Sequence, residues 1–253
     1  MIPRVLVVAG LDPSGGAGLT ADLEALAAVG ARGWAVATAL TAQGPRGARG
    51  VSPASEAFLR LQIDALLEGR ERPHAVKTGM LGTAGLARAL AARLAEPPIA
   101  RVPLVVDPVL LASSGAPLLD PGGVPPGEAL APLLGRARLV TPNLPELAAL
   151  TGVEVADDEA AVRAARMLPA RAVLVKGGHR EGAPVDLLVE GRRRVTRFTG
   201  RRRAGTARGT GCRLASAIAG LLAGGASLEE AVRGGKRVVE RYLDACGRGA
   251  VGR

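Results

Sequence analysis

Short runs of apolar residues alternate along this chain with longer segments in which apolar residues recur at helical spacing. The first run, 5–9, is continuous and ends at Gly10, which is typical of a strand buried on both faces of a parallel sheet. The same pattern predicts further strands at 34–38, 75–77, 104–107, 139–141 and 172–176. Helical spacing predicts helices at 19–29, 58–67, 83–94, 144–150, 159–167, 209–222 and 228–245. This alternation predicts an α/β fold with a doubly wound, mainly parallel sheet and helices on both faces.

The pattern changes towards the end of the chain. The segments 185–190 and 194–198 flank Gly191 and predict a small antiparallel hairpin at the edge of the sheet. The Pro-rich segment 117–132 is expected to be a surface connection. Since no shift in composition marks a linker and no internal repeat is present, we expect residues 1–253 to form a single domain.

The chain is strongly basic, with a formal net charge of +10 and 33 Lys and Arg residues. A basic protein can bind nucleic acid, here through the stretch Arg201-Arg202-Arg203. Only 2% of the residues are aromatic, however, too few for a platform that stacks single-stranded bases, and a general compositional bias towards Arg explains the charge more simply. Lysine is rare, so Lys77 and Lys176 indicate positions at which a compact ammonium is preferred to a guanidinium.

The location of the protein is also an expectation from sequence. No apolar stretch reaches the length of a membrane span, and the N-terminus runs directly into a strand without the features of a signal peptide. Two cysteines, Cys212 and Cys246, do not suggest a disulfide framework. We therefore expect a cytoplasmic protein with no membrane association.

Polar residues and glycines follow one predicted strand after another. In open α/β sheets, ligands bind at the carboxyl ends of the strands, so these residues are candidates for a common site. A Gly-rich loop, 10–18, follows the first strand and contains Asp12, but it lacks the Gly-Lys-Ser/Thr ending of a Walker P-loop. Gln43 follows the second strand, Lys77 to Leu81 the third, and Asp107 ends the fourth. Alone, each of these residues is equally compatible with a loop or capping role.

The next two strand ends carry groups suited to a metal ion and to phosphate. Asn143 and Glu146 are three residues apart and could hold a hydrated Mg²⁺, or they could form a capping box at the start of a helix. Lys176, followed by two glycines, could reach a phosphate as a point charge, or it could be solvated. His179 is expected to be a loop histidine and not a catalyst.

The segment Gly209-Thr210-Gly211-Cys212 opens an apolar helix. Free backbone N–H groups and the positive end of the helix dipole make such a turn an anion site. The same field is expected to stabilise the thiolate of Cys212. This segment therefore combines an anion cradle with a possible proton acceptor.

Taken in order, these motifs resemble the hydroxymethylpyrimidine/phosphomethylpyrimidine kinases of thiamin biosynthesis, which belong to the ribokinase-like superfamily. The resemblance covers nearly the whole chain. Its motifs are AGLDPSGGAG at 9–18 with Ala21-Asp22-Leu23, VDPV at 106–109 with Ser113-Ser114-Gly115, TPNLPE at 141–146, and GTGC at 209–212.

The resemblance implies a role for each motif. The pyrimidine would be bound by Gly10, Asp12, Ala17, Gln43, Met80, Val109 and Cys212, with Gln43 hydrogen-bonding the ring and Met80 packing on its face. Lys176, with Asn143 and Thr210, would bind ATP, while Asp107 and Glu146 would orient Mg²⁺ and its waters. Gly209 and Gly211 would form the anion hole for the transferred phosphoryl group, and Cys212 would accept the alcohol proton.

The implied activity is ATP-dependent phosphorylation of 4-amino-5-hydroxymethyl-2-methylpyrimidine and then of its monophosphate, by a protein expected to be a homodimer that binds no nucleic acid. A pyridoxal or pyridoxamine kinase on the same scaffold is the nearest alternative, and a non-catalytic ligand- or nucleic-acid-binding module is another. Three features depart from the family pattern. Arg208 stands where His is common, the segment 44–47 replaces a usual Asn-Thr pair, and the C-terminus lacks the usual Pro and His.

Overall fold

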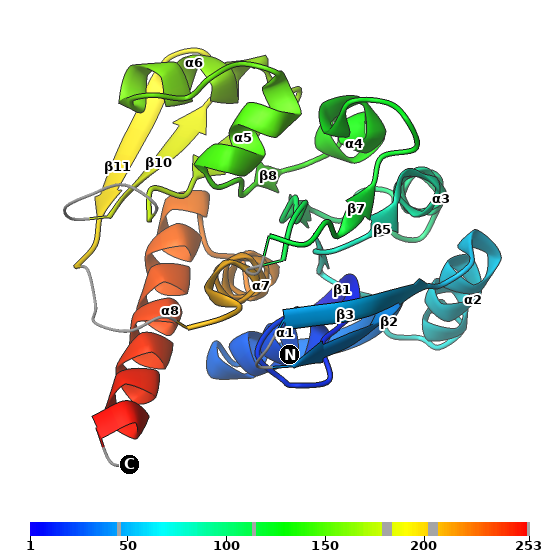
Figure 1. Ribbon diagram of the computed structural model, residues 1–253. Coiled ribbons are helices and arrows are strands. Elements are labelled where there is room, and N and C mark those ends of the chain that lie inside the picture. The colour runs from blue at the N-terminus through cyan, green and yellow to red at the C-terminus, as the bar shows by residue number, and fades with distance from the viewer. Residues whose placement is uncertain (45–46, 113–114, 179–183, 202–206, 252–253) are drawn as a thin grey trace.

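The computed structural model describes residues 1–44, 47–112, 115–178, 184–201 and 207–251 (Figure 1). Ser113 and Ser114 of the second family motif, the loop residue His179, and Arg202 and Arg203 of the basic stretch lie outside the described residues.

A nine-stranded sheet forms the centre of the described structure, in the order β11-β10-β9-β8-β6-β4-β1-β2-β3 (Figure 1). The strands from β2 to β9 in this order are parallel, and antiparallel strands complete the sheet at both edges. A second, two-stranded sheet pairs β5 (Gly82–Thr83) with β7 (Leu119–Asp120). The strands of the main sheet are β1 (Arg4–Leu11), β2 (Arg32–Gly44), β3 (Gly47–Pro53), β4 (Ala75–Thr78), β6 (Leu104–Val106), β8 (Leu139–Val140), β9 (Ala172–Val175), β10 (Val185–Glu190) and β11 (Arg194–Thr199).

Helices cover both faces of the sheet (Figure 1). One face is covered by α1 (Gly18–Ala28), α7 (Thr210–Ala223) and α8 (Leu228–Val251). The other is covered by α2 (Glu56–Leu67), α3 (Ala84–Leu94), α4 (Pro126–Leu134), α5 (Leu144–Thr151) and α6 (Asp158–Met167).

The packing of β1 explains why residues 5–9 are apolar without interruption. Successive side chains of a strand point to opposite faces, and here both faces are buried. Leu6 and Val8 pack beneath α2 to α6, whereas Val5 and Val7 pack beneath α1, α7 and α8. The predicted doubly wound sheet, its parallel strands and the hairpin of β10 and β11 are confirmed.

The expectation of a plain surface connection at 117–132 is wrong, because this segment contains β7 and most of α4. Leu130 and Leu133 of α4 are buried in the core. Pro126 occupies the first turn of the helix, where the missing N–H would have had no partner, so the proline did not exclude a helix there.

The pattern also missed the edge strand β3. It pairs antiparallel with the carboxyl-terminal half of β2, which is longer than predicted. In β3 the residue Val51 is exposed, so the strand lacks the alternation of a half-buried strand. Among the described helices, none is both long and apolar enough to cross a membrane.

Candidate active site

A cavity of about 740 Å³ opens at the carboxyl ends of the parallel strands. A volume of this size suits a small-molecule ligand. Every residue that the sequence assigned to the site lines this cavity: Gly10, Asp12, Ala17, Gln43, Met80, Val109, Asp107, Asn143, Glu146, Lys176, Gly209, Thr210, Gly211 and Cys212.

The Gly-rich loop after β1 is organised around the buried carboxylate of Asp12. Its Oδ1 accepts hydrogen bonds from the backbone N–H and the hydroxyl of Ser14, at 2.9 and 2.7 Å, and its Oδ2 accepts from the N–H of Ala17 at 3.1 Å. Burial by itself raises the pKa of Asp12, but the hydrogen bonds from Ser14 and the charge of Arg208 outweigh it and lower the pKa. Asp12 thus shapes the loop as an ionised carboxylate.

An apolar wall packs against the start of this loop. Met80 packs directly over Gly10, where an added Cβ would lie 2.7 Å from the Met80 sulfur. Met80 clusters with Ala39 and Leu118, and Val109 packs against this cluster. Such a wall suits a flat, apolar ring face, while Gln43 supplies amide donors and acceptors at the end of β2.

The start of α7 packs closely against the Gly-rich loop, and glycine makes this possible. Gly209, the N-cap, has φ of 70°, a left-handed conformation that favours glycine. A Cβ at this position would lie 2.3 Å from the carbonyl oxygen of Gly16 and 3.0 Å from the Cα of Ala17. The free N–H groups at the start of α7 therefore lie beside the loop that holds Asp12.

A lysine and two carboxylates form the opposite side of the cavity. The ammonium of Lys176 lies 3.0 Å from Asp107 Oδ1 and 3.6 Å from Glu146 Oε2. Asp107 Oδ1 also accepts a hydrogen bond from the hydroxyl of Thr141 at 3.0 Å. An added Cβ on Gly211 would lie 3.1 Å from Lys176 Nζ, so this ammonium lies against the first turn of α7.

The charges of this cluster depend on one another. Burial acts to raise the pKa of Asp107, but the ammonium groups of Lys176 and Lys77 lower it overall. For Glu146 burial prevails and the pKa is raised. Burial acts to lower the pKa of Lys176, yet the carboxylates of Asp107 and Glu146 raise it, so Lys176 is charged at neutral pH.

The capping role considered for Asn143 and Glu146 is confirmed. The Asn143 side chain accepts from the Glu146 N–H, and Glu146 Oε2 accepts from the Asn143 N–H, both at 2.7 Å. Glu146 nevertheless also lines the cavity, close to Asp107. Across the described residues, no group of three or more His, Cys, Asp or Glu side chains could enclose a metal. Two carboxylates at an open cavity fit Mg²⁺, which retains waters and takes phosphate oxygens as further ligands.

The expectation of a stabilised thiolate at Cys212 is wrong for the protein without ligand. Cys212 is the third residue of α7 and is only partly exposed, at the cavity. Burial raises its pKa to about 11, and the carboxylates of Asp22 and Asp107 add to this effect. The ammonium of Lys77 acts in the opposite direction but does not compensate. Removal from water is therefore the largest influence on the pKa of this thiol.

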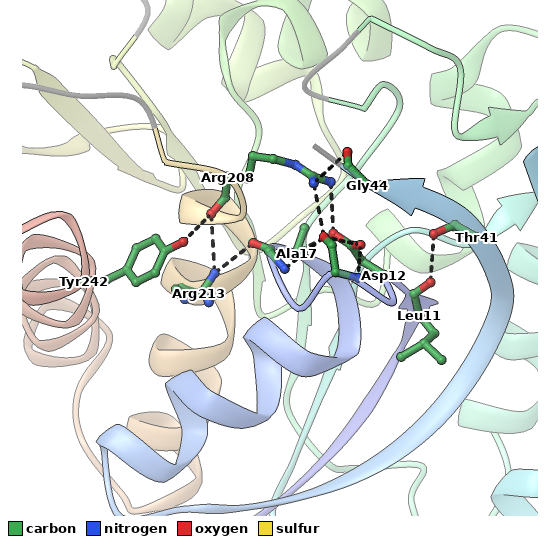
Figure 2. Close-up of polar contacts among 10 residues, drawn as sticks. Leu11, Asp12, Ala17, Thr41, Gly44, Arg208, Arg213 and Tyr242 are labelled. Carbon is green, nitrogen blue, oxygen red and sulfur yellow. Dashed lines mark hydrogen bonds and ion pairs between the residues drawn. The ribbon is translucent and has the colours of Figure 1, made fainter. Parts of the chain in front are cut away.

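Two groups of residues near the site were given no specific role from the sequence. The first is a fully buried ion pair, in which Lys77 Nζ lies 2.7 Å from Asp22 Oδ1 and Ser216 donates to the same oxygen at 2.7 Å. Lys77 also lines the cavity, and its rarity as a lysine was the signal in the sequence. The second group connects Arg208 and Arg213 with the Gly-rich loop, as Figure 2 shows.

Comparison with known proteins identifies the family. Residues 12–251 match the family model described as phosphomethylpyrimidine kinase. The chain belongs to this family. A hydroxymethylpyrimidine/phosphomethylpyrimidine kinase of Streptomyces coelicolor is 41% identical over 250 residues, which cover 96% of this chain and 89% of that relative.

Another member of the phosphomethylpyrimidine kinase family is part of a longer protein. The thiamine biosynthesis bifunctional protein ThiED of Geobacter sulfurreducens is 44% identical over 254 residues, covering 97% of this chain. The chain spans 50% of the length of that relative.

Solved structures share the architecture. The crystal structure of a phosphomethylpyrimidine kinase from Clostridium difficile has a TM-score of 0.79 and 33% identity, covering 96% of this chain and all of that chain. A pyridoxal kinase from Staphylococcus aureus, in complex with AMP-PCP and pyridoxal, has a TM-score of 0.81 and 31% identity, covering 95% and 87% of the two chains. The fold is therefore ribokinase-like, and this phosphomethylpyrimidine kinase family member shares it with kinases for a different vitamin.

Proposed function

We propose that this protein transfers the γ-phosphoryl group of ATP to the hydroxymethyl group of 4-amino-5-hydroxymethyl-2-methylpyrimidine, and then transfers a second phosphoryl group to the resulting monophosphate. The observation that carries this proposal is the arrangement of one cavity. An apolar wall with Met80 lies on one side, a cationic cluster around Lys176 lies on the other, and the start of α7 lies between them. Relatives named for this activity support the choice of substrate.

The catalytic demands of phosphoryl transfer match what the residues offer. Such reactions pass through a loose transition state and need positioning and charge stabilisation more than covalent chemistry. In this proposal the amides around Gly209 and Gly211 hold the transferred phosphoryl group, and Lys176 neutralises the charge that develops on it. Thr210 and Asn143 contact the nucleotide, while the pyrimidine lies among the substrate-side residues Gly10, Asp12, Ala17, Gln43, Met80 and Val109.

Two carboxylates are assigned to the metal ion. Asp107 and Glu146 would hold Mg²⁺ together with phosphate oxygens and water, and Mg²⁺ would supply charge neutralisation on the phosphates. Lys176 pairs with both carboxylates when no ligand is bound. Its ammonium therefore lies beside the place where phosphate is expected. It can turn towards the phosphate and still keep its contact with Asp107 or Glu146.

Cys212 is assigned as the acceptor of the alcohol proton. It stands in the first turn of α7, at the boundary between the substrate side and the phosphate side. With a pKa raised to about 11, the thiolate is a minor form at neutral pH, so the proton transfer should become faster as the pH rises.

The proposed activity is tested by ATP consumption with the purified protein. The acceptors are hydroxymethylpyrimidine, its monophosphate, pyridoxal and pyridoxamine, with product masses measured by mass spectrometry. Rapid conversion of the pyrimidine and its monophosphate is expected, and D107N should reduce turnover strongly with every acceptor. A clear preference for pyridoxal would refute the pyrimidine as the substrate. Pyridoxal is included because the chain is similar to pyridoxal kinases.

Further properties belong to the same proposal. We infer a single kinase domain that works in the cytoplasm as a homodimer. Size-exclusion chromatography with light scattering would measure the assembly, and a monomeric mass at working concentration would refute the dimer. The alternative of a non-catalytic binding module is set aside, because the chain belongs to a family of kinases.

A further inference from the structure

Arg208 immediately precedes the anion-hole segment, and its side chain reaches away from α7 to two other parts of the site (Figure 2). Its Nη2 lies 2.9 Å from Asp12 Oδ2, in an ion pair with the buried carboxylate that organises the Gly-rich loop. Its Nη1 donates to the hydroxyl of Ser14 at 3.2 Å and approaches the carbonyl oxygen of Gly44 at 3.5 Å. One guanidinium therefore joins the loop after β1 with the end of β2.

The backbone of Arg208 is held as firmly as its side chain. Its carbonyl oxygen accepts from the hydroxyl of Tyr242 at 3.1 Å and from Arg213 Nη1 at 3.4 Å (Figure 2). The same Arg213 nitrogen donates to the carbonyl oxygen of Gly16 at 3.1 Å, and its guanidinium stacks 3.8 Å above the ring of Tyr242. Arg213 also pairs with Glu24 of α1 at 2.6 Å. Two arginines thus connect the start of α7 with the Gly-rich loop.

We propose that Arg208 is a positioning residue. It fixes the position of the substrate side of the cavity relative to the anion hole. This proposal rests on the proposed kinase activity. Asp12 lines the cavity, Ser14 belongs to the same loop, and Gly44 follows Gln43, the residue assigned to the pyrimidine. Among the described residues, the side-chain contacts of Arg208 therefore lie on the acceptor side, and the nucleotide-side residues Lys176 and Asn143 are not among them.

The chemistry of the side chain explains why arginine suits this position. The planar guanidinium presents several N–H groups in a fixed fork, so it can contact Asp12 and Ser14 at the same time. A lysine carries one point charge and would keep the ion pair with Asp12 without the full set of contacts. An alanine would leave the buried Asp12 carboxylate, among the described residues, with the neutral donors of Ser14 and Ala17 only.

The kinetic test compares R208A and R208K with a control, R60A. Arg60 also forms a two-point pair with a carboxylate, that of Glu96, but it lies on α2 and does not line the cavity. In R208A, kcat/KM for the acceptor alcohol should fall by about tenfold to a hundredfold, the cost of a small misplacement of reacting groups. R208K should recover part of the loss. The Kd for AMP-PCP, measured by calorimetry, should change less than about twofold in all variants.

A second measurement does not depend on the substrate. Hydrogen–deuterium exchange should show faster exchange at the Ser14 and Ala17 amides in R208A, since Asp12 accepts from both, with R60A unchanged there. Faster exchange in R208A, combined with no pyrimidine turnover by the wild type, would refute the proposed function. The contact of Arg208 with the Gly-rich loop would still be supported. Exchange equal to wild type in R208A, or an equal loss of AMP-PCP affinity and acceptor kinetics, would overturn the positioning role.

Discussion

The ion pair between Lys77 and Asp22 lies in the core of the described structure, and we expect that removing one partner is costly. Both side chains are fully buried, with 0% exposure, and their charged atoms lie 2.7 Å apart. Asp22 Oδ1 has a second donor in Ser216, but within the described residues Oδ2 has no hydrogen-bond partner. Replacing Lys77 with methionine keeps most of the side-chain volume and removes the only nearby positive charge that Asp22 contacts through a hydrogen bond in the described structure.

The expected loss of stability follows from this geometry. Removing one partner of a buried ion pair leaves an uncompensated charge and typically costs about 3–5 kcal/mol. For a chain of this length, one kcal/mol corresponds to a shift in Tm of roughly 2–4 °C. K77M should therefore unfold about 6–20 °C below the wild type. The double variant K77M/D22N removes both charges and should recover most of this loss, because a buried pair without charges is often nearly neutral in stability.

Differential scanning calorimetry of the wild type, both variants and a control, K236M, provides the measurement. Lys236 also pairs with an aspartate, Asp186, but its side chain is 15% exposed and Asp186 keeps a hydrogen bond from the Gly177 N–H, so its loss should cost less. Burial already raises the pKa of Asp22, and loss of Lys77 would raise it further. Since protonation then relieves the uncompensated charge, the deficit of K77M should shrink as the pH falls towards about 5. A Tm within about 2 °C of the wild type, or a double variant less stable than K77M, would refute this account.

Three further predictions concern the cavity. If Cys212 accepts the proton as a thiolate, kcat/KM for the alcohol should rise by about tenfold per pH unit above neutrality, towards the thiol pKa of about 11, and C212A should lose this dependence. A flat wild-type profile would exclude the thiolate. Exposed Cys246 should react with iodoacetamide long before Cys212 at neutral pH, as peptide mass spectrometry would reveal; equal labelling would contradict the raised pKa. In G211A the new Cβ would lie 3.1 Å from Lys176 Nζ, so kcat should fall by about tenfold or more with little change in Tm, and unchanged kcat would remove Lys176 from its proposed contact with the phosphoryl group.

The most predictable parts of the fold are the strands that are buried on both faces, because burial makes their sequences continuously apolar. Residues 5–9 of strand β1 are apolar without interruption because Leu6 and Val7 face different buried layers, so this sequence alone indicates a central strand. Strand β3 is at the edge of the sheet, and residues 49–53 are exposed, so no pattern of buried positions marks it in the sequence. Helix α4 was missed because its prolines suggested a loop, although Pro126 is at a position that helices tolerate.

The candidate site was predictable for a different reason. The carboxyl ends of parallel strands converge, so residues such as Asp107 and Lys176, 69 positions apart in sequence, meet in space. The sequence could not predict the pKa of each ionisable group, because opposing influences act on it in the folded protein. The dipole of α7 favours the thiolate of Cys212 and burial opposes it, and only the three-dimensional surroundings decide which prevails. The partners of Arg208 were equally inaccessible, since Asp12 precedes it by 196 residues.

The hydrogen bond from Tyr242 to the carbonyl of Arg208 connects helix α8 with the backbone beside a cavity that α8 does not line. A chain shortened ahead of Tyr242 would retain every residue of the cavity and yet release the backbone that precedes the anion hole. Attachments placed after α8, in contrast, would leave this contact in place. If Arg208 positions the site as proposed, activity should therefore require α8 to extend at least as far as Tyr242.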